Sequence, residues 1–342
     1  MTLVGRKVIR HRGLSSLCPL PRTFYKISKG GDQLKQPQLY VDNSFLNIFD
    51  KLIEKDIIET CNINLFSIKI RNNAFDYDAL VDQLVDRLVT FCTCSKQYQE
   101  LISTNKSGTL SKNSRKLFRE YIKVKKAGRE YTENDTTDGE VGELMLYSFL
   151  ESHLNAPKIL TKMRFKTSTN DPVKRADGIH LLKIEEGYFQ LIYGESKLYK
   201  DLTSGITDAF KSVHEFKTRN NNNIHDECIF LINNIESELT TKEYEYVKAI
   251  LIPNESEKEY DVSFGIFIGF EIEVPEEFAN KNNREFRIEL KKLLKEKVSE
   301  KIQHIKNKIN EFDIRSNNCY IYLVPFTDLN KDKLKILEAI LE

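Results

Sequence analysis

The fold is decided by one stretch of the chain, Tyr188-Phe-Gln-Leu-Ile-Tyr-Gly-Glu-Ser-Lys-Leu-Tyr199. Its pattern predicts a β-strand, in which successive side chains point to opposite faces. Glu195 and Lys197 then lie on one face, about 6–7 Å apart along the strand. Two opposite charges at the end of an otherwise apolar strand indicate a candidate site, because charges are costly to bury without a partner.

The residues just before this strand predict its partner. Residues 176–184 have the pattern of a strand, and a three-residue loop, 185–187, would join the two strands as a hairpin. In that register Asp177 lies opposite Glu195, on the same face. Two neighbouring carboxylates repel each other unless a cation lies between them, so this pair favours a bound divalent ion.

A third acid is expected from a helix over residues 138–154. The helix begins with Thr137-Asp-Gly-Glu-Val-Gly-Glu, in which Thr137 and Glu140 match a capping box. Glu143 lies one turn further on the same face, and capping does not explain it. We therefore favour Glu143 over Glu140 as the functional acid. For both residues the alternative is an ordinary solvated helix face.

A helix acid, Asp177, a hairpin and the tripeptide Glu195-Ser-Lys197 follow one another in an order that resembles the PD-(D/E)xK nucleases. The resemblance implies an α/β fold with a restriction-endonuclease-like core, here with an N-terminal α/β extension and a C-terminal α/β elaboration. The chain departs from the family pattern at Ala176, where the name-giving motif has proline. The implied catalytic residues are Glu143, Asp177, Glu195 and Lys197, with Glu140 as the alternative helix acid.

The resemblance also implies metal-dependent hydrolysis of phosphodiesters. Carboxylate oxygens suit Mg²⁺ or Mn²⁺, and the metal would lower the pKa of a bound water. Lys197 would position or help deprotonate that water and stabilise the transition state. The expected metal ligands are Asp177, Glu195, Glu143 and the backbone carbonyl of Ser196.

Basic residues are clustered rather than abundant. The chain of 342 residues has 52 basic and 51 acidic residues and a net charge of +1, so contact with nucleic acid would depend on local clusters. Two such clusters lie in 1–31 and 112–129. A third precedes Asp177 and could hold phosphates, although ordinary surface charge is the alternative. Its members are Lys162, Arg164, Lys166, Lys174 and Arg175.

Four segments allow a closer comparison. They are Gly139-Glu-Val-Gly-Glu-Leu-Met-Leu-Tyr147, Thr161-Lys-Met-Arg-Phe-Lys-Thr-Ser168, Arg175-Ala-Asp-Gly-Ile-His-Leu181 and Gly194-Glu-Ser-Lys-Leu-Tyr199. They resemble the nuclease subunit of Hachiman anti-phage defence systems. This resemblance implies a DNA nuclease that works with a superfamily 2 helicase partner, which restrains cleavage until infection or DNA damage is sensed.

Other features limit the class of protein. The chain has no glycine-rich phosphate loop, so any ATPase activity would come from a partner. The six cysteines are scattered, and residues 1–31 contain no apolar signal segment. These features favour a cytoplasmic protein with reduced thiols and no membrane anchor.

Periodicity predicts the remaining elements, in an N-terminal region, 1–125, and a nuclease domain, 126–342. The expected helices are 44–59, 76–92, 138–154, 203–218, 240–250, 281–312 and 328–341. The expected strands are 63–70, 161–168, 176–184, 188–198, 227–233, 261–274 and 319–325. Residues 103–114 are expected to form a linker or loop.

Two other functions stay open from the sequence alone. One is a stand-alone restriction-type endonuclease, which should carry a separate base-reading element that we do not identify. The other is a catalytically inert module that binds DNA or a partner through the N-terminal region and the long helix over 281–312. The inert module predicts that the acids do not converge.

Overall fold

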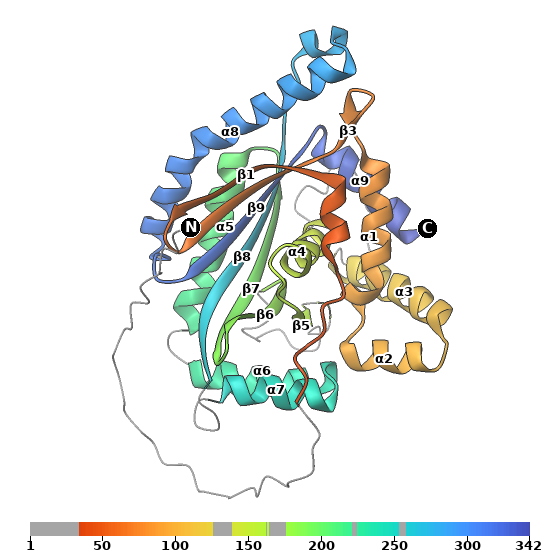
Figure 1. The fold of residues 1–342 in the computed structure, drawn as a ribbon, viewed down its shortest axis with the longest axis vertical. Coiled ribbons are helices and arrows are strands. Elements are labelled where there is room, and N and C mark those ends of the chain that lie inside the picture. The colour runs from red at the N-terminus through yellow and green to blue at the C-terminus, as the bar shows by residue number, and fades with distance from the viewer. Residues whose placement is uncertain (1–33, 126–138, 162, 164–175, 221–223, 253–257) are drawn as a thin grey trace, which may run out of the picture. The chain divides into compact units, whose positions relative to one another are not determined.

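The computed structural model contains a mixed sheet of seven strands in the order β1-β2-β9-β8-β7-β6-β5 (Figure 1). The inner strands β2, β9, β8 and β7 are parallel, and antiparallel pairs form both edges. The strands are β1 (Phe49–Ile58), β2 (Cys61–Ile68), β5 (Lys158–Thr161), β6 (Gly178–Glu185), β7 (Tyr188–Tyr199), β8 (Glu259–Glu271) and β9 (Asn318–Phe326). A separate pair comprises β3 (Ile70–Arg71) and β4 (Ala74–Phe75).

The structure describes residues 34–125, 139–161, 163, 176–220, 224–252 and 258–342. Leu34 to Glu342 form one compact unit. Among the described residues, no helix is both long and apolar enough to cross a membrane. The predicted boundary between residues 125 and 126 stays a prediction, because it borders the undescribed segment 126–138.

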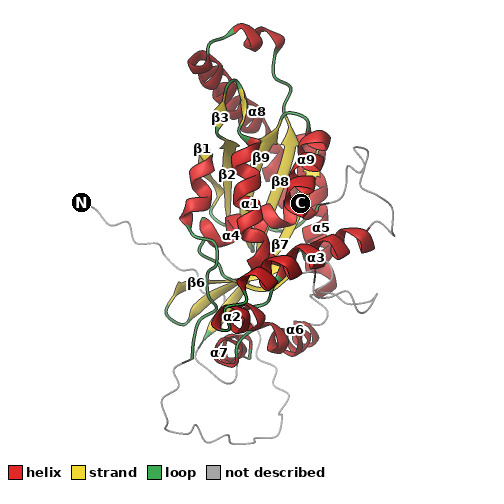
Figure 2. Cartoon of the chain, turned by 90° about the vertical axis from the view of Figure 1, so that its right-hand side faces the viewer, coloured by secondary structure: helices red, strands yellow, loops and turns green. Residues whose placement is uncertain are grey.

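Helices cover both faces of the sheet (Figure 2). On one face, α4 (Glu140–Ser152) packs against β7 and β8, and α1 (Tyr77–Cys92) and α9 (Leu329–Leu341) pack against α4. On the other face, α5 (Leu202–Asn220) packs against β7 and β8, while α8 (Asn283–Glu311) packs against β1 and β2. The remaining helices are η1 (Asn43–Ile48), α2 (Ser95–Ser103), α3 (Ser107–Lys125), α6 (Ile224–Glu238), α7 (Thr241–Leu251) and η4 (Glu276–Asn280). This arrangement confirms the predicted α/β class.

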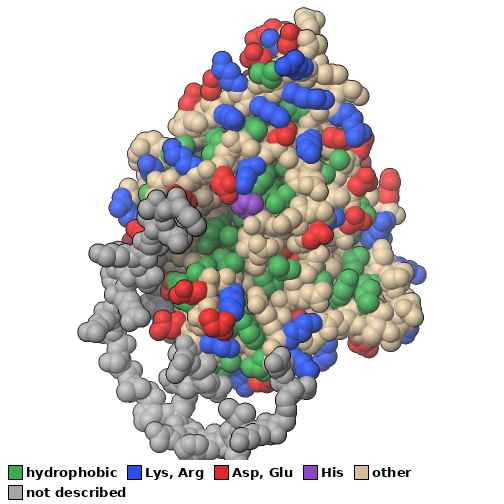
Figure 3. All heavy atoms as spheres, viewed as in Figure 1, with side chains coloured by type: hydrophobic (Ala, Val, Ile, Leu, Met, Phe, Trp, Pro, Cys, Tyr) green, Lys and Arg blue, Asp and Glu red, His purple; other side chains and the backbone are tan. Residues whose placement is uncertain are grey.

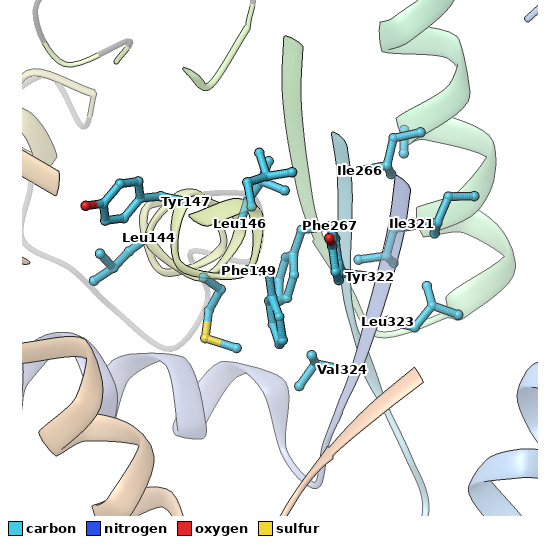
Figure 4. Packing of buried hydrophobic residues seen from close by; sticks show 14 of the residues in the cluster. Leu144, Leu146, Tyr147, Phe149, Ile266, Phe267, Ile321, Tyr322, Leu323 and Val324 are labelled. Atoms are coloured by element: carbon cyan, nitrogen blue, oxygen red, sulfur yellow. The ribbon is translucent and has the colours of Figure 1, made fainter. Parts of the chain in front are cut away.

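Helix α4 forms the centre of the core. All thirteen of its residues are buried, as expected for a helix that is covered on every side. The ring of Phe149 stacks on Tyr322 of β9, with 5.0 Å between ring centroids, and also lies against Phe267 of β8 (Figure 4). The position of α4 therefore depends on two strands from the C-terminal part of the chain.

Three predicted elements are wrong. Residues 44–59 form η1 and β1 rather than one helix, because the β-branched residues after Phe49 pair with β2 in a hairpin. Residues 227–233 belong to α6, since periodicity cannot distinguish a short apolar run in a strand from one in a helix. The expected linker over 103–114 is mostly helical, because α3 begins at Ser107 and buries Leu110, Ser114 and Phe118 at helical spacing.

The other element predictions are confirmed to within a few residues at each end, with one exception. The expected strand over 161–168 begins earlier, at Lys158, and β5 ends at Thr161. Residues 162 and 164–168 lie outside the described part of the chain.

A buried carboxylate joins α4 to two neighbouring segments. Glu151 is fully buried; its Oε2 accepts hydrogen bonds from the backbone N–H groups of Tyr40 and Val41, both at 2.8 Å. Its Oε1 accepts another from the N–H of Lys158, at 3.0 Å. Burial raises the pKa of Glu151, and the three backbone hydrogen bonds oppose that rise. The side chain therefore holds the entering chain and β5 against the end of α4.

We expect Glu151→Gln to lower the free energy of unfolding by about 1–3 kcal/mol, because an amide N–H would then face a backbone N–H. The measurement is urea denaturation of both proteins. The control Glu296→Gln, on the exposed face of α8, should stay within about 0.5 kcal/mol of the parent. Equal stability of the two variants would contradict this role for Glu151.

Candidate functional site

The hairpin of β6 and β7 has the predicted register over most of its length. Gly178 pairs with Gly194, and the same offset continues to Lys183 and Phe189. The turn is one residue tighter than predicted: Glu185 pairs with Tyr188, and a bulge between Lys183 and Glu185 compensates. Gly187 has φ of 80°, a left-handed conformation that glycine adopts without strain.

Asp177 lies just outside this ladder, beside the Glu-Ser-Lys tripeptide. Its N–H donates to the carbonyl of Gly194, at 2.8 Å. Its Oδ2 accepts hydrogen bonds from both the N–H and the Oγ of Ser196, each at 2.7 Å. The carboxylate is therefore fixed to the middle residue of the tripeptide.

The expectation that Asp177 and Glu195 share a face of the sheet is wrong. Ser196 faces α4, because a Cβ added at Gly142 would lie 3.3 Å from its Oγ. Glu195 and Lys197 face α5, where Lys197 forms an ion pair with Asp208 at 3.0 Å. The ladder ends at Gly178, which frees the side chain of Asp177 from strict alternation and lets it turn toward Ser196.

The α4 side of this strand end gathers acids. Glu143 and Asp177 line one small cavity, about the size of a single water molecule, together with His180 and Gly194. Glu140 and Glu143 lie in the first turn of α4, where the helix dipole favours negative charge. The structure thus brings Glu143 and Asp177 together, with Glu140 in the same helical turn.

The predicted capping box is wrong in its register. Gly139 is the N-cap of α4, so Glu140 is the first helical residue rather than the third, and the N-cap glycine has no side chain that could cap this end. Thr137 lies outside the described residues. Capping therefore does not explain Glu140. We now favour Glu143 as the functional acid because it lines the cavity together with Asp177.

Tyr121 of α3 is a site residue that the sequence did not reveal. Its buried hydroxyl donates to both carboxylate oxygens of Glu143, at 2.9 and 3.1 Å. Burial, followed by the negative charges of Glu143, Asp177 and Glu140, raises the pKa of Tyr121 far above its usual value. The only signal in the sequence is the helical spacing of Tyr121 from Phe118 on the inner face of α3.

On the opposite face, Lys197 is held by two acids. Its Nζ lies 2.9 Å from Glu195 and 3.0 Å from Asp208. Burial alone would lower the pKa of Lys197, but the two carboxylates outweigh burial and raise it. Asp208 also accepts a hydrogen bond from the hydroxyl of Tyr199, at 3.0 Å. Sequence reasoning missed Asp208, because an acid on an amphipathic helix has no distinguishing pattern.

His180 lines the same cavity as Asp177. Its Nδ1 lies 2.8 Å from the carbonyl of Ala156. Burial lowers its pKa to about 4, which keeps the ring neutral at physiological pH. The ring is therefore a buried hydrogen-bonding group rather than a charge.

The donor chemistry of the cavity fits a hard divalent cation in part. Glu143 and Asp177 supply carboxylate oxygens, the ligands that Mg²⁺ prefers. Over the described ranges, however, no three acidic, histidine or cysteine side chains form a group that could hold a metal ion. Glu195, the third predicted ligand, is paired with Lys197 toward α5. The carbonyl of Ser196 stays a predicted ligand.

The predicted phosphate contacts before Asp177 cannot be placed. Lys162, Arg164, Lys166, Lys174 and Arg175 all lie outside the described residues, as does the basic segment 1–31. The basic segment 112–129 is described to residue 125, and Lys112, Lys116 and Arg119 are exposed on α3. The phosphate-binding roles of all these residues stay predictions.

Comparison with protein families gives a match that covers most of the chain. The model of the family HamA matches residues 43–340, from the start of η1 into α9. No curated protein and no solved structure matches the chain.

We expect Asp208→Asn to lower the pKa of Lys197 in the metal-free protein, because one of the two charges that raise it is lost. The measurement is an NMR titration of ¹³Cε-labelled lysine, with the signal assigned by a Lys197→Arg variant. Glu215→Gln, on the same helix, is the matched control. An unchanged Lys197 titration in Asp208→Asn would contradict the assigned ion pair.

The raised pKa of Lys197 also predicts how the free energy of unfolding changes with pH. The ion pairs of Lys197 stabilise the folded chain below the ordinary lysine pKa. That stabilisation is lost as the pH rises through the higher folded-state value, so the difference in stability between parent and Asp208→Asn should shrink at strongly alkaline pH.

Proposed function

The chain belongs to the HamA family, the nuclease subunit family of Hachiman anti-phage defence, and from this premise we propose that it is a metal-dependent DNA nuclease. The family assignment confirms the resemblance drawn from the sequence. The PD-(D/E)xK core, the reaction and the metal are parts of the proposal. We further propose that the protein acts in the cytoplasm as the effector of its defence system.

One observation carries the proposal. The carboxylate of Asp177 accepts two hydrogen bonds of 2.7 Å from Ser196, the central residue of Glu195-Ser-Lys197. An aspartate and a Glu-x-Lys tripeptide thus meet at the end of one hairpin, beside the helix that carries Glu143. This order and proximity support a phosphodiester hydrolase better than a chance grouping of charges.

In the proposed reaction, Lys197 supplies positive charge. Its raised pKa keeps it protonated at neutral pH, so it is suited to stabilising charge on the phosphate rather than to removing a proton. It is also accessible, with about a fifth of its side chain exposed (21%). Glu195 and Asp208 would hold Lys197 at the strand end until a phosphate competes for it.

Glu143 and Asp177 would hold the divalent cation at their shared cavity. When bound, Mg²⁺ or Mn²⁺ would activate a water and neutralise charge on the phosphate. The N–H and Oγ of Ser196 both donate hydrogen bonds to Asp177. Hydrogen bonds of this kind commonly fix the orientation of metal ligands. Glu195 would join the ligands only if its ion pair with Lys197 were exchanged.

A second candidate function is an inert binding module, and one observation favours it. Glu195 lies on the α5 side, away from Glu143 and Asp177, so the predicted acids converge only in part. The long helix α8 offers a surface for such a module. Figure 3 shows Lys and Arg side chains gathered along it, and the exposed ones include Arg284, Arg287, Lys292 and Lys295.

Plasmid cleavage distinguishes these functions. We expect the parent to cut DNA with Mg²⁺ and to stop when EDTA is added. Glu195→Ala and Lys197→Ala should each cut at least about 100-fold more slowly, because Lys197 stabilises charge in the transition state and Glu195 holds that lysine in place. The control is Lys183→Ala, at the far end of the same hairpin.

The outcomes separate the alternatives. Parental rates in both site variants would show that the site assignment is wrong. Absence of cleavage in every condition, including with the helicase present, would leave the inert module as the better description. Cleavage confined to one DNA sequence would favour the stand-alone restriction-type endonuclease.

We also propose a superfamily 2 helicase subunit of the same defence system as the partner of this chain. The sequence has no phosphate loop of its own, so an ATP-driven step would require such a partner. Mixing the two purified proteins should give a complex that elutes ahead of either protein in gel filtration. Separate elution at micromolar concentrations would contradict the partnership.

A further inference from the structure

The hydroxyl of Tyr121 contacts the Glu143 carboxylate. It lies 2.9 Å from one oxygen of Glu143 and 3.1 Å from the other. A phenol has one proton, so the two oxygens share a single donor. This contact comes from α3, an element that neither the tripeptide nor the hairpin includes.

The contact is built into the fold. Tyr121 is 3% exposed, and it belongs to a buried stripe on α3 that also contains Leu110, Ser114 and Phe118. The ring of Phe118 packs edge-on against Phe91 of α1, with centroids 6.2 Å apart. Helix α3 thus packs against α1, and this packing holds Tyr121 within hydrogen-bond distance of Glu143.

We propose that Tyr121 is a positioning residue, which orients Glu143 toward the cavity that it shares with Asp177. This inference rests on the proposed metal-dependent function. An ionised carboxylate has about four acceptor positions, so one carboxylate can accept a hydroxyl and also contact a cation. The hydroxyl fixes the rotation of the Glu143 carboxylate, so this ligand would already be oriented when a metal binds.

Packing alone does not account for the hydroxyl. Phenylalanine would keep the buried ring of Tyr121 without its oxygen. The oxygen, in contrast, faces Glu143 and lies within electrostatic range of Asp177 and Glu140 as well. The hydroxyl therefore interacts with these acids, and it donates its hydrogen bond to Glu143.

The test is a titration of the purified chain with Mn²⁺. Electron paramagnetic resonance measures the concentration of free Mn²⁺, and the difference from the total gives the amount bound. We expect Tyr121→Phe to weaken binding roughly 10–100-fold, the usual effect of removing a residue that orients a metal ligand. Asp177→Asn provides the reference for a lost ligand. Tyr322→Phe is the matched control, because Tyr322 is equally buried and its hydroxyl meets His153 instead.

A second readout separates positioning from general damage. In plasmid cleavage, Tyr121→Phe should need more Mg²⁺ for half-maximal rate, and high Mg²⁺ should restore most of the maximal rate. Thermal denaturation should show that Tyr121→Phe and Tyr322→Phe are folded. A merely structural Tyr121 would lower the rate at every Mg²⁺ concentration.

The outcomes identify which idea fails. If the parent binds Mn²⁺, Asp177→Asn does not, and Tyr121→Phe binds like the parent, the positioning role is overturned and the proposed function stands. If the parent itself binds no Mn²⁺, with or without DNA, the proposed metal dependence fails, and the role of Tyr121 fails with it.

Discussion

Everything in this fold depends on burying one helix that carries three glutamates. All thirteen residues of α4 are buried, including Glu140, Glu143 and Glu151. A buried carboxylate is costly unless hydrogen-bond donors surround it. Backbone amides near Tyr40 and in β5 meet Glu151, and Tyr121 meets Glu143. The donors to Glu151 and Glu143 therefore determine where the entering chain, β5 and α3 must lie, and Glu143 also lines an acidic cavity with Asp177.

The strand beside α4 divides the charges between two faces. Alternation along β7 directs Ser196 toward α4, and its neighbours Glu195 and Lys197 toward α5. Asp177 joins the α4 side through Ser196. The candidate site is thus two linked clusters, an acidic one and one centred on a lysine, with a single serine between them. Lys197 lies on one side of this strand end, and the acids Glu143 and Asp177 lie on the other.

Much of this could be predicted from the sequence, because the informative signals are local. The offset of the β6–β7 hairpin follows from the glycine at its turn and from the alternating pattern, and it is correct from Gly178 to Lys183. The face of Asp177 could not be predicted, since it depends on the ladder ending one residue early. Tyr121 and Asp208 could not be predicted for a different reason. No local pattern distinguishes either residue, and each reaches the site only through the packing of its helix.

The place of β9 in the sheet has a consequence for how the protein is made. β9 lies between β2 and β8, so that Ile321 pairs with both Ile63 and Ile266. On the ribosome, β2 is synthesised early and must wait for a neighbour that emerges hundreds of residues later. Its open edge is a surface that pairs readily with other chains, and pairing between such distant segments is slow. A nascent chain consequently cannot complete the core under α4 before β9 has left the ribosome, because Tyr322 of β9 stacks on Phe149 of α4.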